Sequence, residues 1–342
     1  MYLKSYKIFI FAIKLILIIA IFAFLFRQAA SNNAFDELFR QSPRWGFIFA
    51  AFLFQCFSVS TTIIRWRIFA NTLGLILSLK DAFRYGFVGL VLCLAPMGIL
   101  GGDAVKTYLL IHKNPEYRSA ALASVVVDRV IGLLAMFICA TIFICATGFV
   151  FRSEILARSV TNIVLLFTVI GFFGCVFMFL PVFSSADIVR WTLMIPLVGK
   201  HIIKLIHPLL VYRNNLRSVL FCFLISLPVH LSFGFSLYFL ANGIFTSGTV
   251  AVPNLLEHIM LYSAVNITSM IPLAAGPFEF MLEQLYPLFG VSVGVGMVVA
   301  IAFRIVAILV AAIGIIFYFT SRAEIQEAQE DLNQWEKNDN EK

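Results

Sequence analysis

The stretch from Leu94 to Lys106 reads LAPMGILGGDAVK, and its proline and three glycines decide how this part of the chain folds. It lies inside an apolar segment, residues 82–110, that is otherwise long enough to cross a bilayer as a helix. Broken backbone at membrane depth is tolerated only where protein buries it or where it lines a wet cavity. The segment is therefore a candidate for a re-entrant hairpin, which enters the membrane and returns to the same side.

Two ionisable residues follow this break. Asp103 and Lys106 are three positions apart, so they share one helix face directly after Gly101 and Gly102. One interpretation is an open helix N-terminus that meets an anionic lipid headgroup, with Lys106 beside it. The other is an ordinary loop in which Asp103 caps the next helix.

A second broken segment, residues 258–289, resembles the first. Six residues separate Pro96 from Asp103, and six separate Pro272 from Glu279. An arginine then follows each acid in a later apolar segment, 26 residues on in the first case and 25 in the second. This pattern predicts an inverted repeat whose broken helices meet near the midplane, although spacings this short also arise by chance.

The composition of the whole chain is typical of an integral membrane protein. Of its 342 residues 61% are hydrophobic and 13% charged, and the mean hydropathy is +0.96. A soluble domain of this size needs more charge to cover its surface, so lipid is the expected solvent. The clear apolar segments, each a candidate crossing, are residues 8–26, 45–64, 120–150, 160–182, 219–241 and 291–320.

The positions of Lys and Arg decide whether the two broken segments cross. If all eight segments cross, the loops on the two sides hold 11 basic residues each. If the two broken segments re-enter, the tally is 17 inside against 5 outside, which is the bias expected of a membrane protein. We therefore predict an all-α polytopic membrane fold of about six full transmembrane helices plus two re-entrant hairpins, with both termini in the cytoplasm.

Two polar segments are expected outside the bilayer core. Residues 200–208 place their basic residues and histidines on one helical face, as in an interfacial helix. Residues 322–342 form a polar cytoplasmic tail after a membrane domain that covers residues 1–321.

Charged residues inside the apolar segments are the main candidates for function, because a charge in the membrane is costly without a partner. Arg304 has about a dozen apolar residues on either side, and Glu279 or Glu283 is its expected partner. The pair could bind a ligand or be purely structural. Asp128 and Arg129 could lie at the interface or deeper.

A further pair of candidates, Arg65 and Trp66, lies at the end of the second apolar segment. Trp and Arg are usual interfacial anchors there, and contact with a headgroup is the alternative. The sequence contains no nucleophile-and-base arrangement, no ATP-binding loop and no cluster with metal-ligand spacing. We therefore expect no enzymatic activity, no metal and no cofactor.

These residues resemble the transmembrane region of the lysylphosphatidylglycerol synthase family, also called flippase-like membrane proteins. The resemblance covers roughly residues 45–318. The matching elements are Arg65-Trp66, Pro96 with Gly101-Gly102-Asp103, Ser124-Val125, Asp128-Arg129, Gly132-Leu133, and Pro272 with Gly276, Glu279 and Arg304.

The chain departs from the family pattern in three ways. Lys106 stands where the family usually has Arg, which keeps the charge and loses the bidentate fork. The second element reads Ala274-Ala275-Gly276-Pro277, short of the usual double glycine. The aminoacyl-transferase domain of some members is not found in the 22 residues after Thr320, so we expect no synthase activity.

The resemblance implies a protein of the bacterial cytoplasmic (inner) membrane that binds a polar, in particular anionic, lipid and moves it between leaflets. That lipid is a phospholipid or another polar lipid. The alternatives are a membrane-bound transferase acting on lipid-linked substrates, or a non-transporting membrane partner of a separate enzyme. Nucleic acid is not an expected partner. The candidate lipid-binding residues are Arg65, Trp66, Gly101, Gly102, Asp103, Lys106, Asp128, Arg129, Glu279 and Arg304.

Overall fold

The computed structural model describes residues 2–31, 42–93, 98–179, 210–246, 250–271, 273 and 275–320, and it contains no strand in these ranges. Of the predicted features, Pro96, Pro272, the interfacial helix at 200–208 and the tail at 322–342 lie outside the described residues.

Six helices of the described chain are long and apolar enough to cross a membrane, as the sequence predicted. Several are longer than their apolar segments, because polar residues continue the helix beyond the expected hydrocarbon region. They are α1 (Tyr2–Ser31), α3 (Trp45–Thr72), α6 (Arg118–Ala146), α7 (Ile155–Phe179), α10 (Leu216–Ile244) and α13 (Val295–Thr320).

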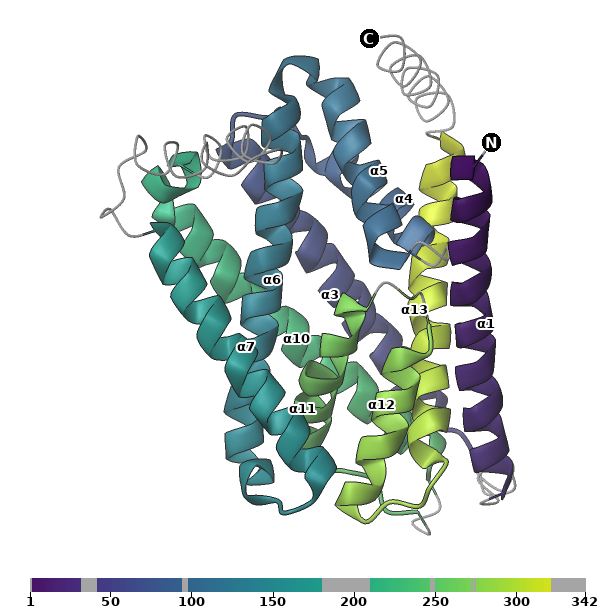
Figure 1. Cartoon of the computed structure of the whole chain (residues 1–342). Helices are drawn as coiled ribbons and strands as arrows, with labels where there is room; N and C mark the ends of the chain where they lie inside the picture. The colour runs from purple at the N-terminus through teal and green to yellow at the C-terminus, as the bar shows by residue number, and fades with distance from the viewer. Residues whose placement is uncertain are drawn as a thin grey trace.

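The two broken segments form helical hairpins that do not cross the bundle (Figure 1). The first consists of α4 (Leu79–Cys93) and α5 (Gly98–Lys113), and it begins and ends at the end of the bundle where α1 starts. The second enters from the opposite end with α11 (Leu255–Val265) and returns with α12 (Pro277–Leu285). The last turn of α4 and the first turn of α5 lie near the middle of the bundle, as do the end of α11 and the start of α12. This arrangement confirms the predicted fold of six spans and two re-entrant hairpins, in which α1 starts and α13 finishes at the same end.

Glycine makes the first hairpin compact. A Cβ atom on Gly102 of α5 would lie less than 3.0 Å from the backbone oxygen of Gly89 on α4 and from Sγ of Cys93. Real Cβ atoms do not approach other atoms so closely, so the two arms pack with their backbones in contact. Gly314 of α13 does the same against the other side of α4, where its Cβ would lie 2.6 Å from the oxygen of Phe87. The first hairpin therefore packs with its backbone in contact with α13.

The second hairpin turns at Gly276, whose φ of +106° suits glycine, and Pro277 starts α12. The Glu279 carboxylate accepts a hydrogen bond of 2.8 Å from the backbone N–H of Gly276, which fixes the first turn of the helix. One turn later, Glu283 accepts from the backbone N–H groups of Gly294 and Met297, at 2.6 and 2.8 Å, and so caps the start of α13. Glu283 is therefore a structural residue, and Glu279 is left to meet Arg304.

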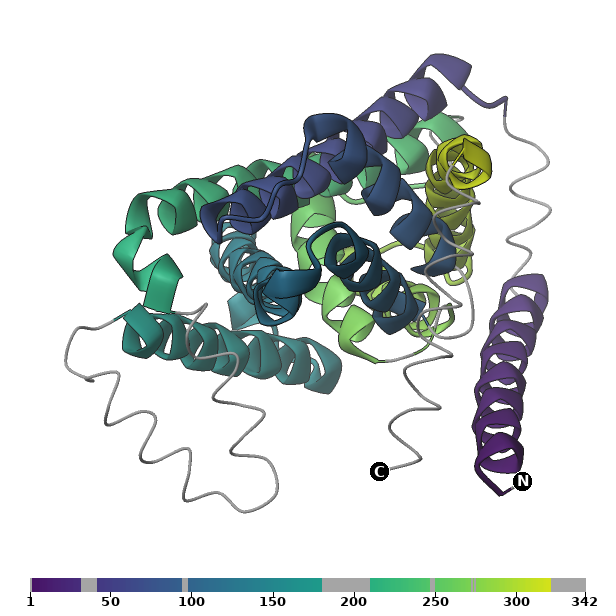
Figure 2. The ribbon, with the colours of Figure 1, turned by 90° about the horizontal axis from the view of Figure 1, so that it is seen from above.

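Helix α1 lies at the edge of the bundle, as the view from above shows (Figure 2). Of its side chains that the structure describes, only Leu25 and Ala29 are buried, against Met297 of α13. The remaining helices pack closely around α6 and α10, where the largest hydrophobic core lies. The first helix is thus an addition to a bundle whose core is formed without it.

Candidate functional site

A half-buried ion pair joins the tip of the second hairpin to α13. Nε of Arg304 donates to Oε1 of Glu279 over 2.7 Å. The Glu279 side chain is fully buried, whereas 30% of the Arg304 side chain is exposed. Both terminal nitrogens of Arg304 are without a hydrogen bond to the residues that the structure describes. This confirms the predicted partner, and it leaves a guanidinium with free donors at the middle of a spanning helix.

The first hairpin carries a matching pair. Arg129 of α6 donates from Nε and Nη2 to the two oxygens of Asp103 on α5, over 2.6 and 2.7 Å. The Arg129 side chain is 39% exposed, so this bidentate pair is also only partly buried. In both cases the acid lies on the returning arm of a hairpin, and the arginine lies on the spanning helix that follows. The shared spacing in sequence therefore corresponds to a shared contact in space, as an inverted repeat requires.

The local structure around Asp103 differs from both sequence interpretations. Helix α5 begins at Gly98, so Asp103 lies inside the helix and does not cap it. The expected open helix N-terminus after Gly102 is wrong for the same reason. Gly102 is buried against α4, and Gly101 is half-buried. The Asp103 carboxylate accepts hydrogen bonds from Arg129 and, among the described residues, none from the N-terminal N–H groups of α5.

Lys106 lies one turn after Asp103 and turns toward α3. Its Nζ is 5.7 Å from the centre of the Trp66 ring, at a distance where a cation is attracted to an aromatic face. Trp66 is only 1% exposed, and Lys106 is half-buried. Among the described residues Lys106 forms no ion pair, and the Trp66 ring is the contact found for its charge.

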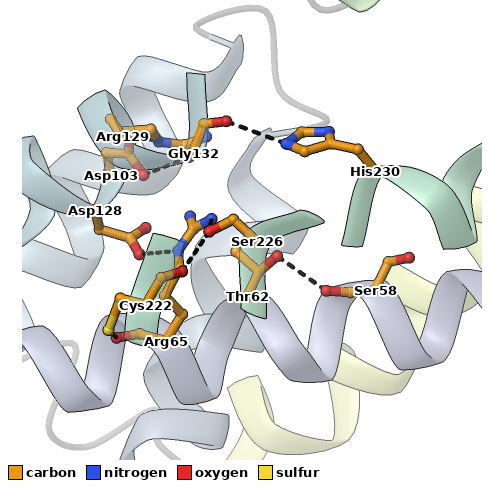
Figure 3. Close-up of polar contacts among 10 residues, drawn as sticks. All are labelled: Ser58, Thr62, Arg65, Asp103, Asp128, Arg129, Gly132, Cys222, Ser226 and His230. Carbon is orange, nitrogen blue, oxygen red and sulfur yellow. Dashed lines mark hydrogen bonds and ion pairs between the residues drawn. The ribbon is translucent and has the colours of Figure 1, made fainter. Parts of the chain in front are cut away.

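Arg65 and Asp128 form a third ion pair that lies inside the protein. Nε of Arg65 donates to Oδ1 of Asp128 over 2.7 Å, and Nη1 donates to Oγ of Ser226 over 2.9 Å (Figure 3). The two charged side chains are 5% and 7% exposed. Gly132 gives the guanidinium its space, because a Cβ there would lie 2.9 Å from Nη2. The pair ties α3, α6 and α10 together.

This burial corrects the prediction for Arg65 and Trp66. We expected an interfacial anchor at the end of α3, but neighbouring helices cover both side chains. Asp128 is buried within the protein against Arg65, and its depth in the membrane stays a prediction. Arg65, Trp66 and Asp128 are thus buried between helices, whereas the neighbouring Lys106 and Arg129 are partly exposed.

Ser226 and His230 complete this polar cluster on α10, and neither was among the residues predicted from the sequence. His230 donates from Nε2 to the backbone oxygen of Gly132 over 3.1 Å, and Figure 3 shows it beside the Arg65 group. Their spacing could have indicated them, because two polar residues four positions apart on an apolar helix share one face. That signal shows a polar face but does not identify its partners.

Together, the fold and the site define a class: an all-α polytopic membrane protein with two opposed re-entrant hairpins, each holding an acid–arginine pair. Residues 11–314 match the family described as the lysylphosphatidylglycerol synthase TM region, and the chain belongs to that family. No curated protein and no solved structure matches the chain.

Proposed function

We propose that the protein binds an anionic phospholipid and moves it between the leaflets of a bacterial cytoplasmic membrane. The observation that carries the proposal is the pair of half-exposed arginines, Arg129 and Arg304, beside the tips of the two hairpins. A guanidinium has five N–H donors, and each of these two uses only part of its set on a carboxylate. The remaining donors suit the oxygens of a phosphate.

The acids give the site its orientation. Glu279 is held by the N–H of Gly276 on one oxygen and by Arg304 on the other, so it has little freedom to move. Glu279 holds the Arg304 guanidinium through its Nε and leaves the two terminal nitrogens of Arg304 without a bond to the carboxylate. A headgroup phosphate would bind there while its acyl chains stay in lipid. Asp103 and Arg129 would serve the same headgroup from the other hairpin, with Lys106 as a further positive charge.

The proposal also includes the orientation of the protein in the membrane and a transport role without catalysis. The excess of Lys and Arg on one side supports cytoplasmic termini. We propose a transporter rather than an enzyme, because the groups that meet at the hairpin tips are ion pairs suited to binding. A transferase would require a donor-binding site, and a non-transporting partner would act only through another protein.

The first prediction concerns Arg304. We expect the Glu279→Gln/Arg304→Leu double variant to slow the movement of labelled phosphatidylglycerol by about 10- to 100-fold, the loss of one charge-assisted contact. Substituting both partners avoids leaving a buried carboxylate unpaired, so the variant should still fold. The measurement uses proteoliposomes and a quencher that cannot cross the membrane. It follows the labelled lipid that leaves the protected leaflet.

The matched control is Arg158→Leu, which removes an exposed arginine from α7. Arg304→Lys keeps the charge without the fork and should retain part of the rate. If the double variant elutes as a monodisperse protein and moves lipid at the wild-type rate, Arg304 is not the headgroup site. If the wild-type protein accelerates no lipid, the proposed function is wrong, and copurification with an enzyme would support the partner alternative.

A further inference from the structure

Helix α1 presents one continuous face to the bundle. The residues that are not exposed recur mainly at intervals of three and four positions, and they include Lys14, Ile18, Ile21, Phe22, Leu25 and Ala29. Most positions between them are exposed, as expected of a helix with one protein-facing side and a larger lipid-facing side. Lys14 therefore belongs to the protein-facing side, although it is the only ionisable residue between positions 8 and 26.

This face of α1 covers the second hairpin next to Arg304. Ile21 lies against the turn at Gly276, where an added Cβ would meet its Cδ1 at 3.1 Å. Leu25 and Ala29 pack with Met297 of α13, and Ile21 and Ile301 border the same cluster. The face that carries Lys14 is thus the face that lies over the break in the hairpin.

The register of the two helices sets the position of Lys14 relative to Arg304. Helices α1 and α13 run in opposite directions (Figure 1), so moving from Ile21 to Lys14 follows the same direction as moving from Ile301 to Arg304. At 1.5 Å per residue, Lys14 lies about 10 Å beyond the shared cluster and Arg304 about 4–5 Å beyond it. Along the bundle, Lys14 therefore lies between Arg304 and the end at which α1 starts and α13 finishes.

The charge of Lys14 has no counterpart in the described part of the chain. Its side chain forms no hydrogen bond or ion pair with those residues, and it is half-buried. An ammonium within the apolar part of a spanning helix is costly unless an anion, water or a headgroup accompanies it. Lys14 lies on the protein-facing side, near the hairpin whose Glu279 pairs with a second cation, Arg304 of α13. An anionic lipid headgroup is the companion that suits both cations.

We infer that Lys14 is a headgroup-binding residue, which receives the phosphate of an anionic phospholipid at the α1–α13 edge before it reaches Arg304. The inference rests on the proposed function and extends it to lipid selectivity. A positive charge at this position favours a net negative headgroup over a zwitterionic one, whose own cation it repels. Lys14 therefore selects phosphatidylglycerol over phosphatidylcholine, whereas Arg304 binds the phosphate that both lipids carry.

The experiment compares two labelled lipids in the same preparation of proteoliposomes, phosphatidylglycerol and phosphatidylcholine. We expect Lys14→Leu to slow phosphatidylglycerol by roughly tenfold, at the lower end for a lost charge-assisted contact, and to change phosphatidylcholine by less than about twofold. Lys14→Arg should restore the difference between the lipids. Lys80→Leu is the control, because it removes an exposed lysine at the start of α4, at the same end of the bundle.

The outcomes separate this inference from the proposed function. If wild-type protein moves both lipids and Lys14→Leu leaves both rates unchanged, Lys14 is only an anchor at the membrane surface, and transport stands without it. If Lys14→Leu and Lys14→Arg slow both lipids equally, the residue has a structural role and the inference is wrong. If wild-type protein moves neither lipid, the proposed function itself fails.

Discussion

Replacing Asp128 with alanine is expected to lower the free energy of unfolding by about 3–5 kcal/mol, the cost of leaving one buried charge without its partner. Arg65 would keep its bond to Ser226 but lose the only carboxylate that its guanidinium contacts among the described residues. Neither water nor lipid can replace that carboxylate, because both side chains of the pair are almost completely covered. The measurement is the thermal unfolding of the purified protein in detergent, followed by its helical circular dichroism.

The control for this prediction is the double variant Arg65→Met/Asp128→Leu. It removes both charges and keeps similar volume, so it should lose far less stability than Asp128→Ala alone. A loss below about 1 kcal/mol for Asp128→Ala would indicate an ion pair open to solvent, since exposed pairs contribute no more than that. In that case Arg65 would be accessible to a lipid headgroup.

Replacing Gly102 with leucine is expected to cost more than about 3 kcal/mol, beyond the usual range for overpacking, because the obstacle is backbone. The first added carbon would lie less than 3.0 Å from the oxygen of Gly89, and α4 cannot yield while Gly314 holds its other side. The hairpin would open and carry Asp103 away from Arg129, so lipid movement should fall together with stability. Unfolding midpoints and transport rates of the same preparation test both effects.

Gly174 provides the matched substitution. It lies on α7, and a Cβ atom there meets nothing within 4 Å. Gly174→Leu should therefore be neutral or stabilising, because leucine favours the helix more than glycine does. If Gly102→Leu and Gly174→Leu behave alike, the two arms of the first hairpin do not pack with their backbones in contact.

The sequence predicted the fold well because membrane topology depends on features that are local or additive. Each spanning helix is recognised from its own apolar residues, and the distribution of Lys and Arg favoured hairpins over crossings for the two broken segments. The start of α5 was missed, because the Gly-rich stretch after Gly98 continues a helix that glycine normally disfavours. Tertiary packing explains the difference: only glycine lets α4 approach α5 so closely, and that contact stabilises the helix.

The two acid–arginine pairs of the candidate site could be predicted because their spacing repeats in the sequence. The buried pair of Arg65 and Asp128 could not. The nearly equal spacing of Asp103 to Arg129 and of Glu279 to Arg304 indicated two related elements, and the structure joins each acid to its arginine. The partner of Arg65 lies 63 residues away on a different helix, and nothing in the spacing indicated it. Such a contact depends on how three helices pack, which a pattern along one chain does not contain. The family match covers residues 11–314, which include these elements, and it assigns no role to them.

Under the proposed function, the opposed hairpins have a consequence for the direction of lipid transport. Two elements inserted from opposite ends would each offer an acid–arginine pair to a headgroup, one for each leaflet. A carrier built this way and without an energy source would move lipid in either direction, so net flux would follow the concentration difference of the lipid and, for an anionic headgroup, the membrane potential. Among the described helices α1 has no counterpart across this pseudo-symmetry. Under the proposed function, Lys14 would therefore distinguish the two entrances kinetically while leaving the equilibrium between leaflets unchanged.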